Sequence, residues 1–258
     1  MLVPRVAWLG ARNPRDPHVG WDQFWQRVVA TGDGGDVLWD SSSGRETRGY
    51  LDLIRERLDR RLPVVDVGCG NGRFTRVLAR EFPTALGVHL SPYAIARARD
   101  ESLDVSGATY LALDAAAACS GRLLRAQVGE ANVFVRGVFH VLDRQSRISL
   151  AANLLQLVGK HGRIFLAETD YHGSALGYLE HLGASPRGIP PALGRAITSL
   201  PRPGHFGEPE RIESFPDRDW ELVEDGATTI DTVPMRGSSE AQPIPGYFAV
   251  LAPRPSDA

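Results

Sequence analysis

The residues of this chain best suited to chemistry are an acid and three glycines spaced two positions apart. Asp66, Gly68, Gly70 and Gly72 come at the end of a short apolar run, LPVVDV, at residues 62–67. Such glycines let the main chain bend sharply and let a ligand approach it, while the first amides of a following helix point into the gap. The pattern predicts a strand, a turn and a helix that bind a nucleotide-like ligand or a carboxylate. A tight turn without a ligand is the alternative.

A histidine and an arginine lie near the end of another apolar segment, ANVFVRGVFHVLD, at residues 131–143. We expect Arg136 and His140 at the carboxyl end of a strand or just past it, where open α/β sheets bind ligands. Arg136 is a candidate for binding the ligand of the glycine turn. His140 can deprotonate a hydroxyl or thiol, because imidazole has the side-chain pKa nearest to neutrality. Alternatively, His140 is a packed residue bonded to a backbone carbonyl.

Three further polar candidates lie in residues 171–206, a segment too long for a plain crossover and punctuated by glycine and proline. We expect this segment to lie over the mouth of the site. Tyr171 and His172 are candidates to orient or deprotonate an acceptor, and His205 is a candidate to bind it. Surface positions without chemistry are the alternative for each. No spacing resembles a set of metal ligands, so no metal site is predicted.

The remaining elements must place these residues together. Strands and helices alternate over residues 62–168, and right-handed crossovers between them give a parallel sheet. Two short helices are expected after it, at about 174–182 and 190–199. Two extended stretches, at 219–235 and 244–255, end the chain.

The composition narrows the class of protein. The chain has 258 residues and a formal net charge of −2, with both signs interleaved, which argues against a nucleic-acid or membrane surface. No apolar run approaches the roughly 20 residues that a bilayer requires. The two cysteines, Cys69 and Cys119, cannot form a disulfide framework, so we expect a cytoplasmic protein.

The glycine turn, VVDVGCGNG in this sequence, resembles motif I of the class I S-adenosylmethionine-dependent methyltransferases. The resemblance implies an α/β fold with a Rossmann-like, seven-stranded, mostly parallel sheet, helices on both faces and a terminal antiparallel strand pair. It also implies S-adenosylmethionine as the cofactor and S-adenosylhomocysteine as the product. Asp66, Gly68, Cys69 and Gly70 would hold the methionine end, with Asp66 acting on the ammonium group.

Later segments resemble further motifs of this family. GVHLSPYAIARAR, at residues 87–99, is similar to the second motif, in which an acid grips both ribose hydroxyls. Here His89 replaces the acid, followed by Leu90, and a half-exposed histidine without a role in ligand binding is the alternative. A neutral imidazole accepts one hydroxyl proton and lacks the bidentate acceptance of a carboxylate. Asp114 and Ala115 match the positions that contact adenine, although Asp114 also suits a helix N-cap.

The region before the glycine turn is expected to form an N-terminal helical lid. Residues 1–20 are rich in proline and are predicted to be irregular or mobile. Trp21, Trp25 and Trp39 follow, and this segment resembles the N-terminal lid of small-molecule enzymes such as the thiopurine and halide/thiol methyltransferases. The tryptophans would then bind the acceptor, whereas ordinary packing at the sheet edge is the alternative. We therefore divide the chain into a lid or cap segment, 1–60, and a cofactor-binding domain, 61–258.

Taken together, the sequence predicts an enzyme that transfers a methyl group to oxygen, nitrogen or sulfur of a small-molecule metabolite. It would act as a monomer or homodimer, without nucleic-acid or membrane partners. Two alternatives remain open. One is an enzyme of the same fold that does non-methylating chemistry on the cofactor, such as an intramolecular cyclisation, and the other is a non-catalytic cofactor-binding protein.

Overall fold

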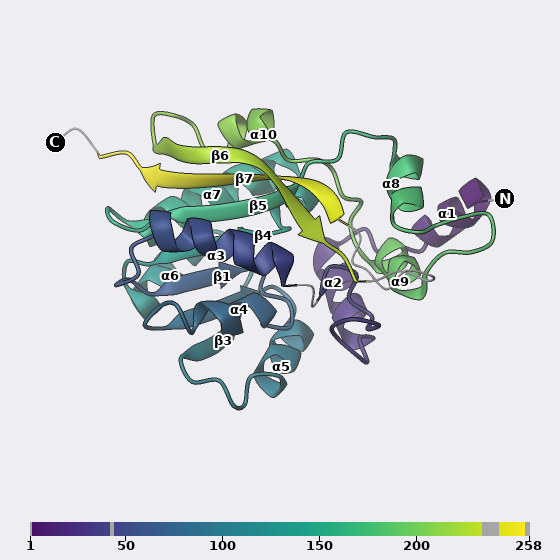
Figure 1. The fold of residues 1–258 in the computed structure, drawn as a ribbon, viewed down its shortest axis with the longest axis horizontal. Coiled ribbons are helices and arrows are strands. Elements are labelled where there is room, and N and C mark those ends of the chain that lie inside the picture. Colours follow the sequence, from purple (N-terminus) through teal and green to yellow (C-terminus); the bar gives the residue numbers. More distant parts are fainter. Residues whose placement is uncertain (1, 42–43, 234–242, 256–258) are drawn as a thin grey trace.

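One seven-stranded sheet forms the centre of the molecule (Figure 1). The computed structural model describes residues 2–41, 44–233 and 243–255. The strand order is β3-β2-β1-β4-β5-β7-β6, in which only the pairs made by β7 are antiparallel. This confirms the predicted fold class. The strands are β1 (Val64–Val67), β2 (Ala85–His89), β3 (Ala108–Ala112), β4 (Asn132–Arg136), β5 (Ile164–Thr169), β6 (Trp220–Asp231) and β7 (Pro243–Pro253).

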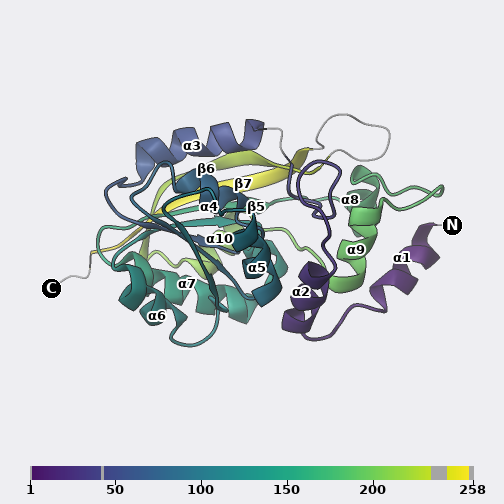
Figure 2. The same ribbon diagram turned by 90° about the horizontal axis from the view of Figure 1, so that it is seen from below.

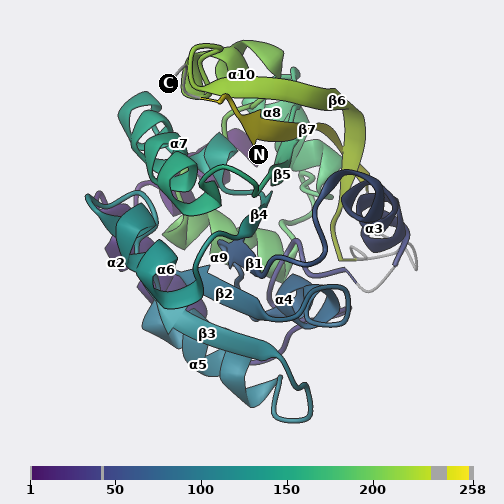
Figure 3. The ribbon, with the colours of Figure 1, turned by 90° about the vertical axis from the view of Figure 1, so that its left-hand side faces the viewer.

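Helices cover both faces of the sheet, because the central strands are apolar on both sides. Every residue of β1 and of β5 is buried. In Figure 3, α3 and α4 lie on one face, and α6, α7 and α10 lie on the other. The helices of these layers are α3 (Arg45–Arg57), α4 (Arg73–Leu78), α5 (Pro92–Asp100), α6 (Ser120–Val128), α7 (Arg144–Val158) and α10 (Glu208–Ser214).

Four more helices gather beyond one end of the sheet, as Figures 1 and 2 show. They are α1 (Leu2–Gly10), α2 (Pro17–Gln26), α8 (Ala175–His181) and α9 (Pro191–Ser199). Both α1 and α2 contact α9, and α2 also contacts α5. The first and last thirds of the chain thus meet at one place, at the carboxyl ends of the parallel strands.

The structure departs from the sequence-based expectation in the first 20 residues. They are not irregular, since they form α1 and the start of α2. Pro4 falls in the first turn of α1 and Pro17 opens α2, two positions that tolerate proline because no intrahelical N–H bond is needed there. Asp16 caps α2 by accepting a hydrogen bond from the His18 N–H at 2.9 Å. The prolines therefore mark helix starts.

Other expected elements are present with shifted ends. The two short helices predicted in the insertion are α8 and α9. The helix expected directly after β3 begins only at Ser120, and α10 was not predicted. Residues 234 and 235 of the extended stretch 219–235 lie outside the described residues. Among the described residues, no helix has the length and apolar character needed to cross a bilayer.

Candidate active site

A cavity of about 930 Å³ lies between the carboxyl ends of the strands and the four end helices. It brings together most of the residues predicted from sequence. Those that line it are Gly68, Gly70, His89, Leu90, Asp114, Ala115, Arg136, His140, Tyr171, Trp21, Trp25, Trp39 and His205. Asp66, Cys69 and His172 are not part of the lining.

The glycine turn has the geometry that its spacing predicts. Gly68, Gly70 and Gly72 have φ angles of 82°, 56° and 76°, in the left-handed region that favours glycine. A Cβ at Gly68 would lie 2.3 Å from Cγ2 of Val138, and one at Gly70 would lie 3.1 Å from the ring of Trp25. The turn is therefore a close-fitting cradle whose main chain faces the cavity.

Asp66 and Cys69 lie beneath this turn. The Asp66 carboxylate is buried and accepts a hydrogen bond from Thr75 Oγ1 at 2.5 Å. Burial raises the pKa of Asp66 to about 7, although the bond from Thr75 and the charge of Arg136 act against this rise. Burial also raises the pKa of the Cys69 thiol. A direct contact of Asp66 with the cofactor ammonium stays a prediction, since Thr75 holds the carboxylate in this structure.

His89 differs from the acceptor that we expected. Its Nδ1 accepts a hydrogen bond from the Ser91 N–H at 3.0 Å, so the neutral ring carries its proton on Nε2 and can only donate there. Burial lowers the pKa of His89 to about 3. Trp21 and Trp25 pack edge-on against it, with ring centroids at 5.5 and 5.8 Å. A ribose hydroxyl would therefore receive a hydrogen bond from His89.

Asp114 is held by a residue of the N-terminal segment. Its Oδ2 lies 3.2 Å from Nε2 of His18, at the start of α2, and its Oδ1 accepts from the Ala116 N–H at 2.9 Å. His18 was not predicted from the sequence, because its place beside Asp114 depends on the packing of α2 against α5 and α9. This pair ties the first helices to the edge of the cavity.

His140 and Glu168 form a hydrogen-bonded pair. His140 Nδ1 lies 2.8 Å from Glu168 Oε2, and because a carboxylate only accepts, Nδ1 carries the proton. The neutral ring then has its lone pair on Nε2, which has no bonded partner among the described residues. This is the tautomer that a general base requires.

Glu168 is itself fixed by the main chain. It is fully buried at the end of β5, and Oε1 accepts from the N–H groups of Val138 and Phe139, each at 2.9 Å. Glu168 was not predicted from the sequence. Its signal there was an acid directly after the apolar run at residues 164–167, because a buried carboxylate needs several donors.

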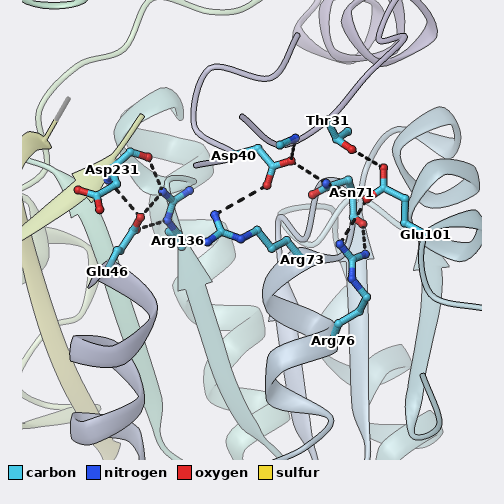
Figure 4. Close-up of polar contacts among 10 residues, drawn as sticks. Thr31, Asp40, Glu46, Asn71, Arg73, Arg76, Glu101, Arg136 and Asp231 are labelled. Atoms are coloured by element: carbon cyan, nitrogen blue, oxygen red, sulfur yellow. Dashed lines mark hydrogen bonds and ion pairs between the residues drawn. The ribbon is translucent and has the colours of Figure 1, made fainter. Parts of the chain in front are cut away.

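Arg136 lines the cavity, but its guanidinium is engaged elsewhere (Figure 4). It forms a two-bond ion pair with Glu46, with Nη2 at 2.8 Å from Oε2, and the Asp231 N–H also donates to Glu46 at 3.1 Å. Burial acts to lower the pKa of Arg136, but the charge of Glu46 and the hydrogen bonds to it together outweigh burial, so the pKa lies above its ordinary value. Arg136 thus links β4 to α3 and β6, and cofactor contact remains a prediction.

A second polar network joins the loop after α2 to the glycine turn (Figure 4). Asp40 Oδ2 accepts from the Gly32 N–H at 2.7 Å and from Asn71 Nδ2 at 2.9 Å. Asn71 also donates to Glu101 at 3.0 Å, and Thr31 donates to the same carboxylate at 2.7 Å. The loop is therefore anchored to the residue between two glycines of the turn.

The other predicted polar residues lie at different depths. Tyr171 lines the cavity. His172 is exposed and lies 2.9 Å from Asp170, with its ring 5.1 Å from that of His205. His205 lies 3.2 Å from Glu210.

In the part of the chain that the structure describes, no group of three or more His, Cys, Asp and Glu side chains is arranged to hold a metal ion.

The tryptophans of the N-terminal segment both pack and line the cavity. Trp25 is buried in a cluster with Phe24, while Trp21 and Trp39 pack against it. The Nε1 of Trp25 is buried and has no hydrogen-bond partner among the described residues. A buried indole N–H without a partner beside the glycine turn suits a ligand that accepts a hydrogen bond.

Known proteins resemble the chain in both sequence and fold. Residues 64–162 match the family model described as a methyltransferase domain. A trans-aconitate 2-methyltransferase from Mycobacterium tuberculosis is 36% identical over 77 residues, which are 27% of this chain and 30% of that protein. The match thus spans less than a third of the relative's length.

Two solved structures extend the likeness to nearly the whole chain. An S-adenosylmethionine-dependent methyltransferase from Anabaena variabilis has a TM-score of 0.83 at 24% identity, covering 94% of this chain and 97% of that one. The N-methyltransferase NodS from Bradyrhizobium japonicum, solved with S-adenosylhomocysteine, has a TM-score of 0.54 at 16% identity, covering 93% and 100%. Residues 64–162 of this chain are therefore similar to a methyltransferase domain, and the chain has the fold of S-adenosylmethionine-dependent methyltransferases.

Proposed function

We propose that this chain transfers a methyl group from S-adenosylmethionine to oxygen, nitrogen or sulfur of a small-molecule metabolite and releases S-adenosylhomocysteine. The single observation that carries this proposal is that one cavity is lined both by the glycine turn and by His140, whose tautomer Glu168 fixes. A site for a nucleotide-like ligand and a positioned base would therefore share one cavity.

The residues present fit this cofactor. The turn offers main chain that side chains at Gly68 and Gly70 would obstruct, and Trp25 offers a buried N–H without a partner. His89 and Asp114 would face the ribose and the adenine, since both line the cavity next to the ends of β2 and β3. When bound, the cofactor would supply an electrophilic methyl carbon attached to a positively charged sulfur, and this sulfur would depart as part of the leaving group.

The protein's own part is to align the acceptor, to exclude water and to take up a proton. His140 Nε2 would accept the proton of the acceptor, and Glu168 would keep the ring in the required tautomer. The helices α1, α2, α8 and α9 line the cavity on the side away from the strands. The volume of the cavity suits metabolites, because small-molecule sites usually measure about 300–1,000 Å³.

Calorimetric titration with S-adenosylmethionine and with S-adenosylhomocysteine tests the proposal. We expect dissociation constants near the micromolar range, which correspond to a binding free energy of about −8 kcal/mol. No binding at millimolar concentration would remove the proposal. Product analysis then separates methyl transfer, which yields S-adenosylhomocysteine, from cyclisation, which yields methylthioadenosine.

A further inference from the structure

The cavity has two ends of different chemistry. One, the turn end, contains Gly68, Gly70, His89 and Asp114, all of which belong to the sheet and its loops. The other, the cap end, is lined by α1, α8 and α9 and by the ends of β6 and β7 nearest to them (Figures 1 and 2). If the turn end holds the cofactor, the cap end is left for the acceptor.

The cap end is apolar. Its lining side chains include Val6, Leu176, Leu179, Ile197, Ile230 and Ile244. Among the described residues, α1, α8, α9, β6 and β7 contribute no charged side chain to the lining. Several of these side chains, such as Ile197, pack against a buried apolar cluster and are only partly buried themselves. They present apolar surface that a ligand can cover.

The charged residues that line the cavity do not alter this character. Arg136 is paired with Glu46, and Asp114 lies at the turn end beside His18. Arg15 and Arg202 also line the cavity, but both are exposed to solvent. An anion bound deep in the cap end would therefore lose its hydration without a buried cation to replace it.

The base adds a second requirement. His140 Nε2 is the ring nitrogen left free to take a proton, because Nδ1 donates to Glu168. A carboxylate acceptor is already ionised at neutral pH and needs no base. An alcohol, phenol or thiol carries a proton that must leave as the bond to the methyl carbon forms.

We infer, on the basis of the proposed function, that the acceptor is a predominantly apolar molecule that is methylated at a hydroxyl or thiol. In that step the acceptor oxygen or sulfur gains the methyl group, the sulfonium–methyl bond breaks, and the acceptor proton passes to His140. A polycarboxylate such as trans-aconitate, named in the mycobacterial relatives, does not suit the cap end.

Ligand binding to the protein saturated with S-adenosylhomocysteine tests this inference without turnover. The probes are 4-phenylphenol, 2-naphthalenethiol and trans-aconitate. The binding of each probe is measured by calorimetry and by the change in fluorescence of the lining tryptophans. We expect at least one apolar probe to bind about 100-fold more tightly than trans-aconitate, and to become methylated with S-adenosylmethionine. Equal or tighter binding of trans-aconitate overturns the inference.

The outcomes separate the two proposals. If S-adenosylhomocysteine binds but neither apolar probe does, the acceptor class is wrong and the proposed function stands. If S-adenosylhomocysteine itself does not bind, the proposed function fails, and the acceptor class with it.

Variants place the binding at the cap end. Ile197→Asp puts a charge on the lining and should weaken binding of the apolar probe by 10-fold or more, while S-adenosylhomocysteine binding changes less than about 2-fold. Ile212→Asp, at an exposed position of α10, is the matched control and should change neither. Ile197→Trp, which fills space and adds no charge, keeps the test valid if the aspartate variant does not fold. Wild-type binding of the probe by the folded Ile197 variants contradicts the inference.

Discussion

The two ends of the cavity are built in different ways. The turn end uses main chain and short side chains at the ends of neighbouring parallel strands, so its shape follows from the sheet itself. The cap end uses apolar side chains from helices near the start of the chain and from helices after β5. These two groups of helices meet only because both fold over the carboxyl ends of the parallel strands. The rigid part of the site is therefore suited to a constant ligand, and the helical part can change its specificity while the sheet stays the same.

The largest expected effect concerns His140, the candidate base, which lines the same cavity as both ends. His140→Ala should lower kcat for a hydroxyl or thiol acceptor by about 10²–10⁴-fold, because the general base is lost. Binding of S-adenosylhomocysteine should stay within about 2-fold, since the turn end is intact. His161→Gln is the control, because His161 is exposed and paired with Glu130. A wild-type kcat in His140→Ala would remove the base from the mechanism.

The next effect concerns the buried acid of the turn end. The pKa of Asp66 rises from 3.8 to about 7 on folding, so the folded state holds the proton more tightly than the unfolded state. The stability that this contributes is present below pH 3.8 and is lost as the pH rises through 7. The full difference corresponds to about 4 kcal/mol as an order of magnitude.

Urea unfolding at pH 5 and pH 8 measures the part of this loss that falls between pH 5 and about pH 7, which is about 3 kcal/mol as an order of magnitude. Asp66→Asn should show a smaller fall in the free energy of unfolding between the two pH values than the wild type does. His89 acts in the opposite direction, because its folded pKa of about 3 is below 6.5 and stability is lost as the pH falls through this range. His89 is present in both the wild type and Asp66→Asn, so its contribution to the pH dependence cancels when the two proteins are compared. Asp104→Asn, at an exposed site, should behave as wild type, and identical slopes in all three proteins would contradict the prediction.

A smaller effect tests whether the close contact at Gly70 matters for cofactor binding beyond the positive φ of this glycine. Gly70→Ala should weaken binding of S-adenosylhomocysteine by about 10-fold, because a Cβ there meets the Trp25 ring and strains a φ of 56°. Gly129→Ala is the matched control, since Gly129 has a φ of 79° but open space around it. It carries the backbone strain alone. Equal affinities for the two variants would show that the close approach at Gly70 does not matter for the cofactor.

The smallest effect tests how firmly the N-terminal helices close the turn end. His18→Gln removes the pair with Asp114, both members of which are partly exposed. Such pairs contribute about 0–1 kcal/mol, so S-adenosylhomocysteine affinity should change by no more than about 5-fold. Calorimetry at two salt concentrations checks this, and a change of 50-fold or more would mean that the pair controls closure.

The turn end and the cap end also differ in how much of their structure could be predicted from the sequence. The sheet and the turn end were predictable because strand, turn and helix are adjacent in the chain, and the glycine spacing reports a backbone conformation that other residues resist. Glu168 and Glu46 were not predicted, since their partners are 28 and 90 positions away and depend on strand order. The irregular reading of residues 1–20 failed because α1 is stabilised by contacts with α9, which no local pattern reveals.

The strand order also bears on how the chain is made. Strand β7 lies between β5 and β6, so one edge of β5 has no neighbour until the last strand has left the ribosome. About 80 residues separate the two strands, which at 5–20 residues per second is a delay of about 4–16 s. For that time a fully buried strand of the finished protein is an open edge able to pair with another chain. A nascent chain halted before residue 243 would keep that edge, which makes truncation near the C-terminus a predicted route to aggregation during synthesis.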